Sequence, residues 1–478
     1  MLTELDLLTS GTALLAALAS GELGAEELTL AQLDRIAGAG AALNAVVTLD
    51  ADAAVRAARA VDADRAAGRP LGPLAGLPVT VKDAFDAAGL QTSQGRAADA
   101  RPATVDAPAV HRLRAAGCVV LGKTNVPAFL ASLHTWNDLF GVTVSPWDPA
   151  FSSGGSSGGA SAAVAAGLAV ADLGSDLAGS LRVPAAWCGL FAHRPSNGIV
   201  SKRGHLPWPL DGLLEPMVSA VGPMTRSAAD TELFFAQLAG PEGPEAVGWR
   251  LDLPRPRVRA LGDLRVAVWT EDAVCRTDTE TRAAIRSFAD QLADAGARVT
   301  ELVPPVGGPA DQALFARLQA GEVARGMDDE AWTDARARAA AGDPAAALLT
   351  QDLRSALADL EAQRAATLRW QQLFAEVDVV LCPAVARAAI TPEPDGTTPE
   401  TVEVDGAVVP IDTLSDWSRL SSLGRLPATV VPLGPGAVSG LPIGAQLLGP
   451  YLEDRTPLRA AVLAEEAGLL RFRPPPGW

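Results

Sequence analysis

The sequence predicts an α/β fold in which helices cover both faces of a central sheet. Segments with apolar residues spaced by three and four alternate with short, fully apolar segments, as expected for helices packed on buried strands. Apolar residues make up 48% of the 478 residues and charged residues only 20%. This composition can fill a sizeable core and excludes a disordered protein.

The first half of the chain supplies many of these elements. Residues 1–68, rich in Ala, Leu and Glu, predict two or three amphipathic N-terminal helices. Residues 69–240 hold the densest motifs, and the apolar segment 76–85 predicts a short strand that ends at Lys82 and Asp83. We also expect helices at 107–117 and 159–167 and strands at 118–122 and 168–174.

The second half repeats the alternation of helices and strands. The Pro- and Arg-rich stretch 241–263 predicts a surface connection between two halves of a single domain, residues 1–478. Residues 308–375, rich in Ala, Arg and Asp, predict helices that form a cap over a cleft. Within 264–478 we further expect a helix at 279–296 and strands at 264–269, 298–303, 377–384 and 427–434.

Charge and composition exclude several classes of function. The net charge of -17 argues against a nucleic-acid-binding face, which needs basic patches. The first basic residue is Arg35, so the N-terminus lacks the charged region of a signal peptide, and no apolar run is long enough to span a membrane. The cysteines form no C-x-x-C pair and the histidines no H-x-x-x-H pair. We therefore expect reduced thiols, a cytoplasmic location, no metal and no cofactor.

Lysine is rare in this chain. Of 39 basic side chains, only Lys82, Lys123 and Lys202 are lysines. Arginine cannot lose its proton in a protein, whereas a buried lysine can. Lys82, at a predicted strand end, is therefore a candidate base, and the alternative is that a lysine stands there by chance.

The segment GCVVLGKT (117–124) matches the G-x-x-x-x-G-K-[ST] pattern of phosphate-binding loops. In such a loop the glycines follow a strand, their N–H groups face phosphate, and a helix begins at the lysine. Here Cys-Val-Val-Leu separates the two glycines and favours a buried strand, and Asn125-Val126-Pro127 is a poor helix start. The pattern therefore does not indicate a nucleotide site.

The run SSGGSSGGAS (152–161) admits three interpretations. Gly/Ser tracts are usually linkers, but a small-residue helix, a strand and tight turn signals follow this one at once. Ser156 satisfies the G-x-S-x-G pattern of a nucleophile elbow, but no strand leads into Gly154 and His193 follows too closely for the order Ser, acid, His. A rigid loop that opens a helix, with available N–H groups and close chain approach, fits best.

A strand-end lysine and two Gly-containing loops with serines point to nucleophilic catalysis. Ser156 and Ser157 lie in the first loop, and Ser180 follows Asp176 in the second, GSDLAGS (174–180). A deprotonated lysine can act as the base for a serine, and a second serine can relay the proton. The approach to Ser180 can direct backbone N–H groups at a developing oxyanion.

These segments resemble the amidase signature family. The match comprises VKD (81–83), GGSSGG (154–159) and GSDLAGSLRVPA followed by CGLFAHRP (174–195), in order and spacing, and further segments extend it over nearly the whole chain. The resemblance implies one α/β/α domain with a large, mixed, twisted sheet covered by helices on both faces.

The resemblance also implies roles for single residues. Ser180 matches the nucleophile, Ser156 the bridging serine with a cis peptide bond, and Lys82 the general base. The chain departs from the family at Ala178, where Gly is usual; if the backbone there needs a positive φ, Ala costs roughly 1 kcal/mol. The oxyanion-hole backbone would comprise Leu177, Ala178, Gly179 and Ser180, and the supporting positions Ser157, Asp176 and Arg182.

Three functions follow as alternatives. The first is an amidase, a monomer or homodimer, that acts alone on a small carboxylic acid amide. The second is the glutaminase subunit of a tRNA-dependent amidotransferase; the chain lacks the Tyr-Asp-Gly segment expected in the cap of such subunits, and its one tyrosine is Tyr451. The third is a non-catalytic binding protein of the same fold, which the intact triad positions disfavour.

The resemblance places substrate specificity in segments 125–145, 310–375 and 385–425. Aromatic residues in or near them are candidate pocket walls, although each could equally belong to the core. If several line the cleft, apolar or aryl amides are the expected substrates, and a cyclic or linear aminohexanoate amide is another candidate. These residues are Trp136, Phe140, Trp208, Trp332 and Trp417.

Overall fold

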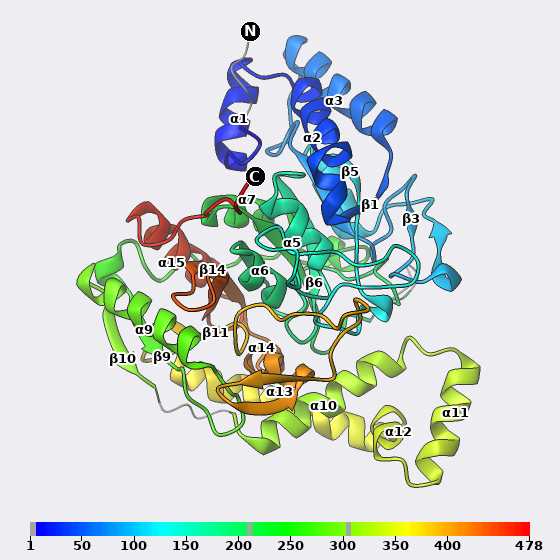
Figure 1. Ribbon diagram of the computed structural model, residues 1–478, viewed down its shortest axis with the longest axis vertical. Coiled ribbons are helices and arrows are strands. Elements are labelled where there is room, and N and C mark those ends of the chain that lie inside the picture. The colour runs from blue at the N-terminus through cyan, green and yellow to red at the C-terminus, as the bar shows by residue number, and fades with distance from the viewer. Residues whose placement is uncertain (1–5, 208–211, 213, 303–306) are drawn as a thin grey trace.

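A computed structural model of the protein describes residues 6–207, 212, 214–302 and 307–478 (Figure 1). Over these residues, one sheet of eleven strands forms the centre of the molecule. In sheet order its strands are β1 (Val46–Leu49), β5 (Val119–Thr124), β2 (Pro78–Lys82), β6 (Ala171–Asp176), β8 (Ala220–Thr225), β7 (Phe191–Arg194), β14 (Ala428–Pro435), β15 (Pro442–Leu448), β11 (Val379–Pro383), β9 (Arg265–Val268) and β10 (Arg298–Glu301).

The sheet is mixed, as the resemblance implies. Strands β5, β2 and β6 run parallel, and so do β11, β9 and β10 near the other edge. Antiparallel pairs through β8, β7, β14 and β15 join the two parallel groups, and β1 adds an antiparallel edge. Two small hairpins lie outside the sheet: β3 (Gln91–Thr92) with β4 (Arg101–Pro102), and β12 (Thr401–Val404) with β13 (Ala407–Pro410).

Many helices begin directly after a Ser or Asp whose side chain accepts a backbone N–H of the first turn. Asp50, for example, accepts from Ala53 N at 2.9 Å and starts α3. Helices capped in this way are α1 (Gly11–Ser20), α3 (Ala51–Ala66), α7 (Ala228–Leu238), α9 (Thr279–Asp294), α11 (Asp329–Ala340), α12 (Pro344–Leu349) and α13 (Leu353–Leu373). Other helices are α2 (Ala25–Ala37), α4 (Pro108–Ala115), α5 (Gly158–Ala165), α6 (Arg182–Cys188), α8 (Glu245–Gly248), α10 (Pro309–Ala324), α14 (Asp416–Leu423) and α15 (Arg455–Glu466).

Most of the predicted strands and helices are present, with small shifts. The strand expected at 168–174 is β6 (Ala171–Asp176), since the chain turns after α5 before it enters the sheet. Strands β1, β7, β8 and β15 were not predicted as strands. The connection 241–263 contains the helical turn α8 and buries Leu253 and Val258, so only part of it lies on the surface.

The segment predicted as a helical cap forms α10 to α13, and Figure 1 shows α11 and α12 at the edge of the molecule. Helices α10 and α13 pack near the predicted oxyanion loop. Leu314, Phe315 and Leu318 of α10 share an apolar cluster with Ala366 of α13, and the partly buried Leu177 and Ala178 pack against that cluster.

In the described part of the chain, no helix is long and apolar enough to cross a membrane. No group of three or more His, Cys, Asp or Glu side chains among these residues could hold a metal ion. The four cysteines are buried free thiols, as predicted: Cys118, Cys188, Cys275 and Cys382.

Candidate active site

The candidate site forms where two parallel neighbouring strands end. Strands β2 and β6 pair in parallel, with Val81 opposite Leu173, so their carboxyl ends lie side by side. Lys82 is the last residue of β2, and Ser175 and Asp176 are the last residues of β6. Ligand sites of α/β sheets commonly lie at this edge.

Lys82 is buried and contacts two hydroxyl groups. Its side chain has 0% exposure, and its Nζ donates to Ser156 Oγ at 2.7 Å and to Ser175 Oγ at 3.0 Å. Burial, followed by the positive charge of Lys202, lowers the pKa of Lys82 to about 7. A large fraction of Lys82 is therefore neutral near pH 7, as a general base requires.

The Gly/Ser run is a packed loop that opens a helix. The peptide bond between Gly155 and Ser156 is cis, and α5 begins at Gly158 with all of its residues buried. A Cβ at Gly155 would lie 2.3 Å from Ser132 O, so only glycine allows this approach of two chain segments. The burial and the close packing confirm the rigid loop and exclude a flexible linker.

The pattern that resembles a phosphate-binding loop lies in a strand, as predicted. Gly122 and Lys123 belong to β5, which is buried throughout. A Cβ at Gly122 would lie 2.0 Å from Thr48 O of the edge strand β1, which accounts for the glycine. Lys123 forms a buried ion pair with Asp83 at 3.2 Å and donates to Phe85 O at 2.6 Å, so its role is structural.

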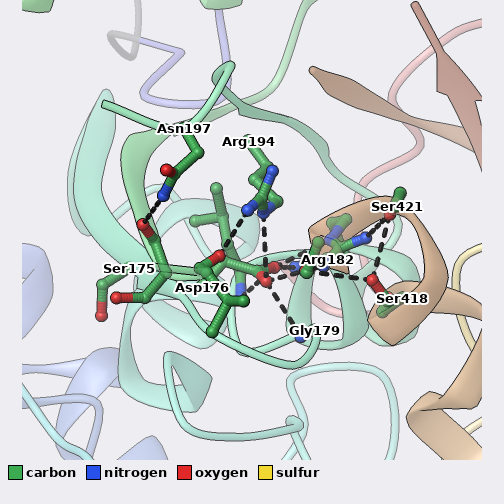
Figure 2. A network of polar contacts seen from close by, with 12 residues as sticks. Ser175, Asp176, Gly179, Arg182, Arg194, Asn197, Ser418 and Ser421 are labelled. Carbon is green, nitrogen blue, oxygen red and sulfur yellow. Dashed lines mark hydrogen bonds and ion pairs between the residues drawn. The ribbon is translucent and has the colours of Figure 1, made fainter. Parts of the chain in front are cut away.

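Asp176 organises the loop that leads to Ser180. Figure 2 shows its carboxylate beside the guanidinium of Arg182, with the Gly179 amide close to it. Arg182 donates to both carboxylate oxygens, at 2.7 and 2.9 Å, and the backbone N–H groups of Gly179 and Leu181 donate at 2.9 and 3.1 Å. Although burial opposes ionisation, Arg182, Arg194 and the Gly179 N–H hold the pKa of Asp176 well below its usual range.

Arg182 also ties this loop to the second half of the chain. Its guanidinium donates to Ser421 Oγ at 2.5 Å and Ser422 Oγ at 2.9 Å, both on α14, and to Gln446 Oε1 of β15 at 3.0 Å. The ion pair with Asp176 is fully buried. It is tolerated there because every N–H of the guanidinium has an acceptor. The predicted supporting roles of Asp176 and Arg182 thus have a structural basis.

Ser180 lies in this loop, just before α6, and is half-buried. Its carbonyl accepts the N–H of Ser157 at 3.1 Å, which joins the two predicted catalytic loops. In the part of the chain that the structure describes, no hydrogen bond links Ser180 Oγ to Ser156. Lys82 and Ser156 are therefore in side-chain contact. Ser180 is joined to the Ser156 loop only by the backbone hydrogen bond from Ser157.

The backbone around Ser180 bears on two predictions: the strain at Ala178 and the set of oxyanion donors. The positive φ of the loop falls on Gly179, at 112°, and Ala178 is not in the positive-φ region. Alanine at 178 therefore carries no backbone strain of this kind. The N–H of Gly179 already donates to Asp176, so in this conformation the predicted oxyanion donors are the N–H groups of Leu177, Ala178 and Ser180.

The protein-family model described as Amidase matches residues 27–458. The chain belongs to the amidase signature family. It is 33% identical over 472 residues to indoleacetamide hydrolase of Bradyrhizobium diazoefficiens, covering 96% of this chain and 86% of that protein. It is 32% identical over 489 residues to a glutamyl-tRNA(Gln) amidotransferase subunit of Chloroflexus aurantiacus, covering 96% of each. A solved structure of 6-aminohexanoate cyclic dimer hydrolase superposes with a TM-score of 0.82 at 25% identity, covering 99% of both chains.

The aromatic residues proposed as pocket walls of this amidase-family protein fall into different environments. Trp417 is 1% exposed, packs edge-on against Trp269 with ring centroids 5.0 Å apart, and donates from its indole to Thr277 Oγ1 at 2.8 Å. Trp417 is therefore a core residue, and its prediction as a wall was wrong. Trp136, Phe140 and Trp332 are half-buried and stay candidates, and Trp208 lies outside the described residues.

Two of the predicted specificity segments meet. His134 Nε2 lies 3.1 Å from Gly396 O, and the Ser132 and Thr398 hydroxyls lie 2.7 Å apart. These contacts place segment 125–145 against segment 385–425, next to the loop that carries Ser156. A groove of about 1190 Å³ lies elsewhere, between α9 and the β14–β15 turn; residues such as Glu280 line it, but none of the triad positions does.

Sequence reasoning missed Ser175 and His205, although both belong to the lysine site. Ser175 Oγ lies between Lys82 Nζ and His205 Nε2, at 3.0 and 2.8 Å. Its position directly before Asp176 in the signature was the available signal. His205 carried no such signal. Its position near the end of β2 depends on a bridge to Phe85, a residue far from His205 in the sequence.

Proposed function

We propose that this protein is an amidase that acts alone and hydrolyses a small carboxylic acid amide to a carboxylate and ammonia or an amine. One observation carries the proposal: a buried lysine amine, with its pKa lowered to about 7, lies 2.7 Å from the Ser156 hydroxyl. Membership of the amidase signature family supports hydrolase chemistry.

In the first half-reaction, neutral Lys82 accepts a proton from Ser156 as Ser156 takes the proton of Ser180. Ser180 Oγ then forms a bond to the amide carbonyl carbon, and the carbonyl π electrons move to oxygen. Loop N–H groups near Ser180 stabilise this oxyanion, a contribution that is often worth several kcal/mol in such enzymes. Collapse of the intermediate breaks the C–N bond, and the relay returns the proton to the leaving nitrogen.

In the second half-reaction, water attacks the acyl group on Ser180. The same relay removes a proton from the water, and collapse of the second intermediate restores the Ser180 hydroxyl and releases the carboxylate. Lys82 is neutral again at the end of the cycle. Each half-reaction therefore needs a lysine that both accepts and returns one proton, a task that arginine cannot perform.

The alternative is the glutaminase subunit of a tRNA-dependent amidotransferase, because an amidotransferase subunit is among the relatives. The chain lacks the Tyr-Asp-Gly segment expected of such subunits. Its one tyrosine, Tyr451, stacks on Arg425 at 4.3 Å and hydrogen-bonds to it, which is a structural role. Purification from the native host tests this alternative: a stoichiometric partner together with glutaminase activity would favour the amidotransferase.

The test of the proposal is a panel of amides that includes aryl, indolyl and aminohexanoate amides and glutamine. Release of ammonia or amine is measured for the wild type, Ser180→Ala and Lys82→Met, with Ser287→Ala, an exposed serine on α9, as the control. We expect activity in the wild type and control, and loss by a factor of roughly 10³ or more in the other two. Unchanged turnover in Ser180→Ala would contradict the mechanism.

A further inference from the structure

A histidine reaches the lysine of the proposed site through one hydroxyl. His205 Nε2 lies 2.8 Å from Ser175 Oγ, which in turn lies 3.0 Å from Lys82 Nζ. The three residues have exposures of 1%, 4% and 0%. We propose that His205 is a positioning residue that acts through the Ser175 hydroxyl to direct the lone pair of Lys82 at Ser156. This inference rests on the proposed function, in which Lys82 is the base.

The contacts of His205 define its tautomer. Its Nδ1 lies 2.6 Å from Leu206 O, and a carbonyl oxygen can only accept, so Nδ1 carries the proton. In the neutral ring Nε2 then holds a lone pair and accepts the hydroxyl proton of Ser175. Burial, together with the charges of Lys202 and Lys82, lowers the pKa of His205 well below its usual value, which supports the neutral ring.

This tautomer fixes what Ser175 can offer to Lys82. With its proton donated to His205, the Ser175 hydroxyl can only accept from Lys82. The Ser175 carbonyl, 3.5 Å from Nζ, can also only accept. The protonated amine donates to Ser156 Oγ at 2.7 Å. A neutral amine has two N–H groups and one lone pair, so when both N–H groups turn toward Ser175 the lone pair is left for Ser156. Without His205, the Ser175 hydroxyl could donate to Lys82 and occupy the lone pair that Ser156 needs.

The backbone holds the His205 ring in place relative to Lys82. Leu206 N donates to Ala84 O at 2.8 Å, and His205 forms a β-bridge with Phe85. Ala84 and Phe85 lie two and three residues after Lys82, the end of β2. The Phe85 ring meets the imidazole edge-on, with centroids 4.6 Å apart. The ring is therefore fixed to the chain segment that directly follows Lys82, as expected of a group that orients a reacting atom.

The experiment measures the rate at which a fluorophosphonate inactivates Ser180, from pH 6 to 10, for the wild type, His205→Phe, Ser175→Ala and the double variant. We expect His205→Phe to lower the limiting rate at high pH by roughly tenfold to a hundredfold, without raising the pH at half-maximal rate. In the Ser175→Ala background the same change should have no further effect, because the competing hydroxyl is gone. His205→Gln, whose amide oxygen can accept from Ser175, should keep more of the rate than His205→Phe.

Two results would overturn the inference: a wild-type rate in His205→Phe, or an equal loss when Ser175 is already alanine. If His205→Phe does not fold, ¹⁵N spectra of the wild type with labelled histidine decide instead. The inference requires that, between pH 7 and 9, the His205 ring carries a proton on Nδ1 and none on Nε2. A proton on Nε2 contradicts it. Failure of the wild type to react at Ser180 would instead contradict the proposed function, so the two failures are distinguishable.

Discussion

Lys82 Nζ lies 2.7 Å from Ser156 Oγ, and neither side chain is more than 1% exposed. The contact joins the end of β2 to a loop 74 residues later in the chain. The glycines before Ser156 let that loop pack closely enough for the contact. The next residue, Ser157, donates its N–H to the Ser180 carbonyl. A buried amine beside a hydroxyl, with a second serine loop joined to it by the backbone, is an arrangement suited to proton relay.

The rate of the reaction should rise with pH through an ionisation near 7. Lys82 is the group that must be neutral, and its pKa is lowered to about 7 by burial and by Lys202, while Asp176 and Asp172 act in the opposite direction. Protonation below that value removes the base, so kcat/KM should fall by about tenfold per pH unit on the acidic side. A pH profile from 5 to 10 measures this; a rate independent of pH between 6 and 8 would exclude Lys82 as the base.

Lys202→Met should move this acidic limb to higher pH. Lys202 Nζ donates to Ser219 Oγ at 2.7 Å and lies 3.7 Å from Glu322 of α10, and its positive charge helps to lower the pKa of Lys82. Removal of that charge makes Lys82 easier to protonate, so its pKa rises. The control is Arg338→Met, an exposed arginine on α11. A shift to lower pH in Lys202→Met would contradict the electrostatic account.

Lys82→Met should remove a pH-dependent part of the stability. The folded-state pKa of Lys82, about 7, lies below its unfolded value near 10.4, so between these values the unfolded chain binds more protons. The free energy of unfolding of the wild type should therefore rise with pH across this window relative to the variant, with a slope of at most about 1.4 kcal/mol per pH unit. Urea unfolding at pH 7, 8 and 9 measures the difference. A value for the wild type minus the variant that falls as pH rises would be the wrong sign.

Asp176→Asn should destabilise the fold strongly. The substitution leaves the Arg182 guanidinium buried at 0% exposure without its counter-charge, and breaking such a pair typically costs about 3–5 kcal/mol. Asp334→Asn is the matched control, because its pair with Arg338 is exposed on both sides and is worth roughly 0–1 kcal/mol. Chemical denaturation of both variants compares them; equal losses would show that the buried pair contributes little.

The local signals in the sequence predicted the catalytic segments well. The apolar run before Lys82 and the small-residue run after Ser156 each contain enough residues of one kind to define a strand and a helix. Strands such as β8 and β15 were missed because Gly and Pro interrupt their apolar residues. Their pairing depends on neighbours far away in the chain, which a single sequence does not reveal.

The scarcity of lysine, which singled out Lys82 as a candidate base, also marks buried positions. All three lysines are buried: Lys82 and Lys123 at 0% and Lys202 at 3% exposure. The pattern thus marks sites where a compact amine is enclosed by acceptors, and Lys123 shows that such a site can be purely structural. The contact of Lys82 with Ser156 is what separates it from the other two. Trp417, in turn, was proposed as a pocket wall because it lies in segment 385–425, and its burial in the core depends on packing that a single sequence does not reveal.

Covalent labelling shows which serine is the nucleophile and whether it depends on Lys82. The protein is treated with a fluorophosphonate at pH 8.5, and peptide mass spectrometry identifies the modified serine in the wild type and in Lys82→Met, with circular dichroism to verify that both are folded. We expect a label on Ser180 in the wild type and its loss in Lys82→Met. A label on Ser156, or an equal label on Ser180 in both proteins, would contradict the roles assigned to these residues.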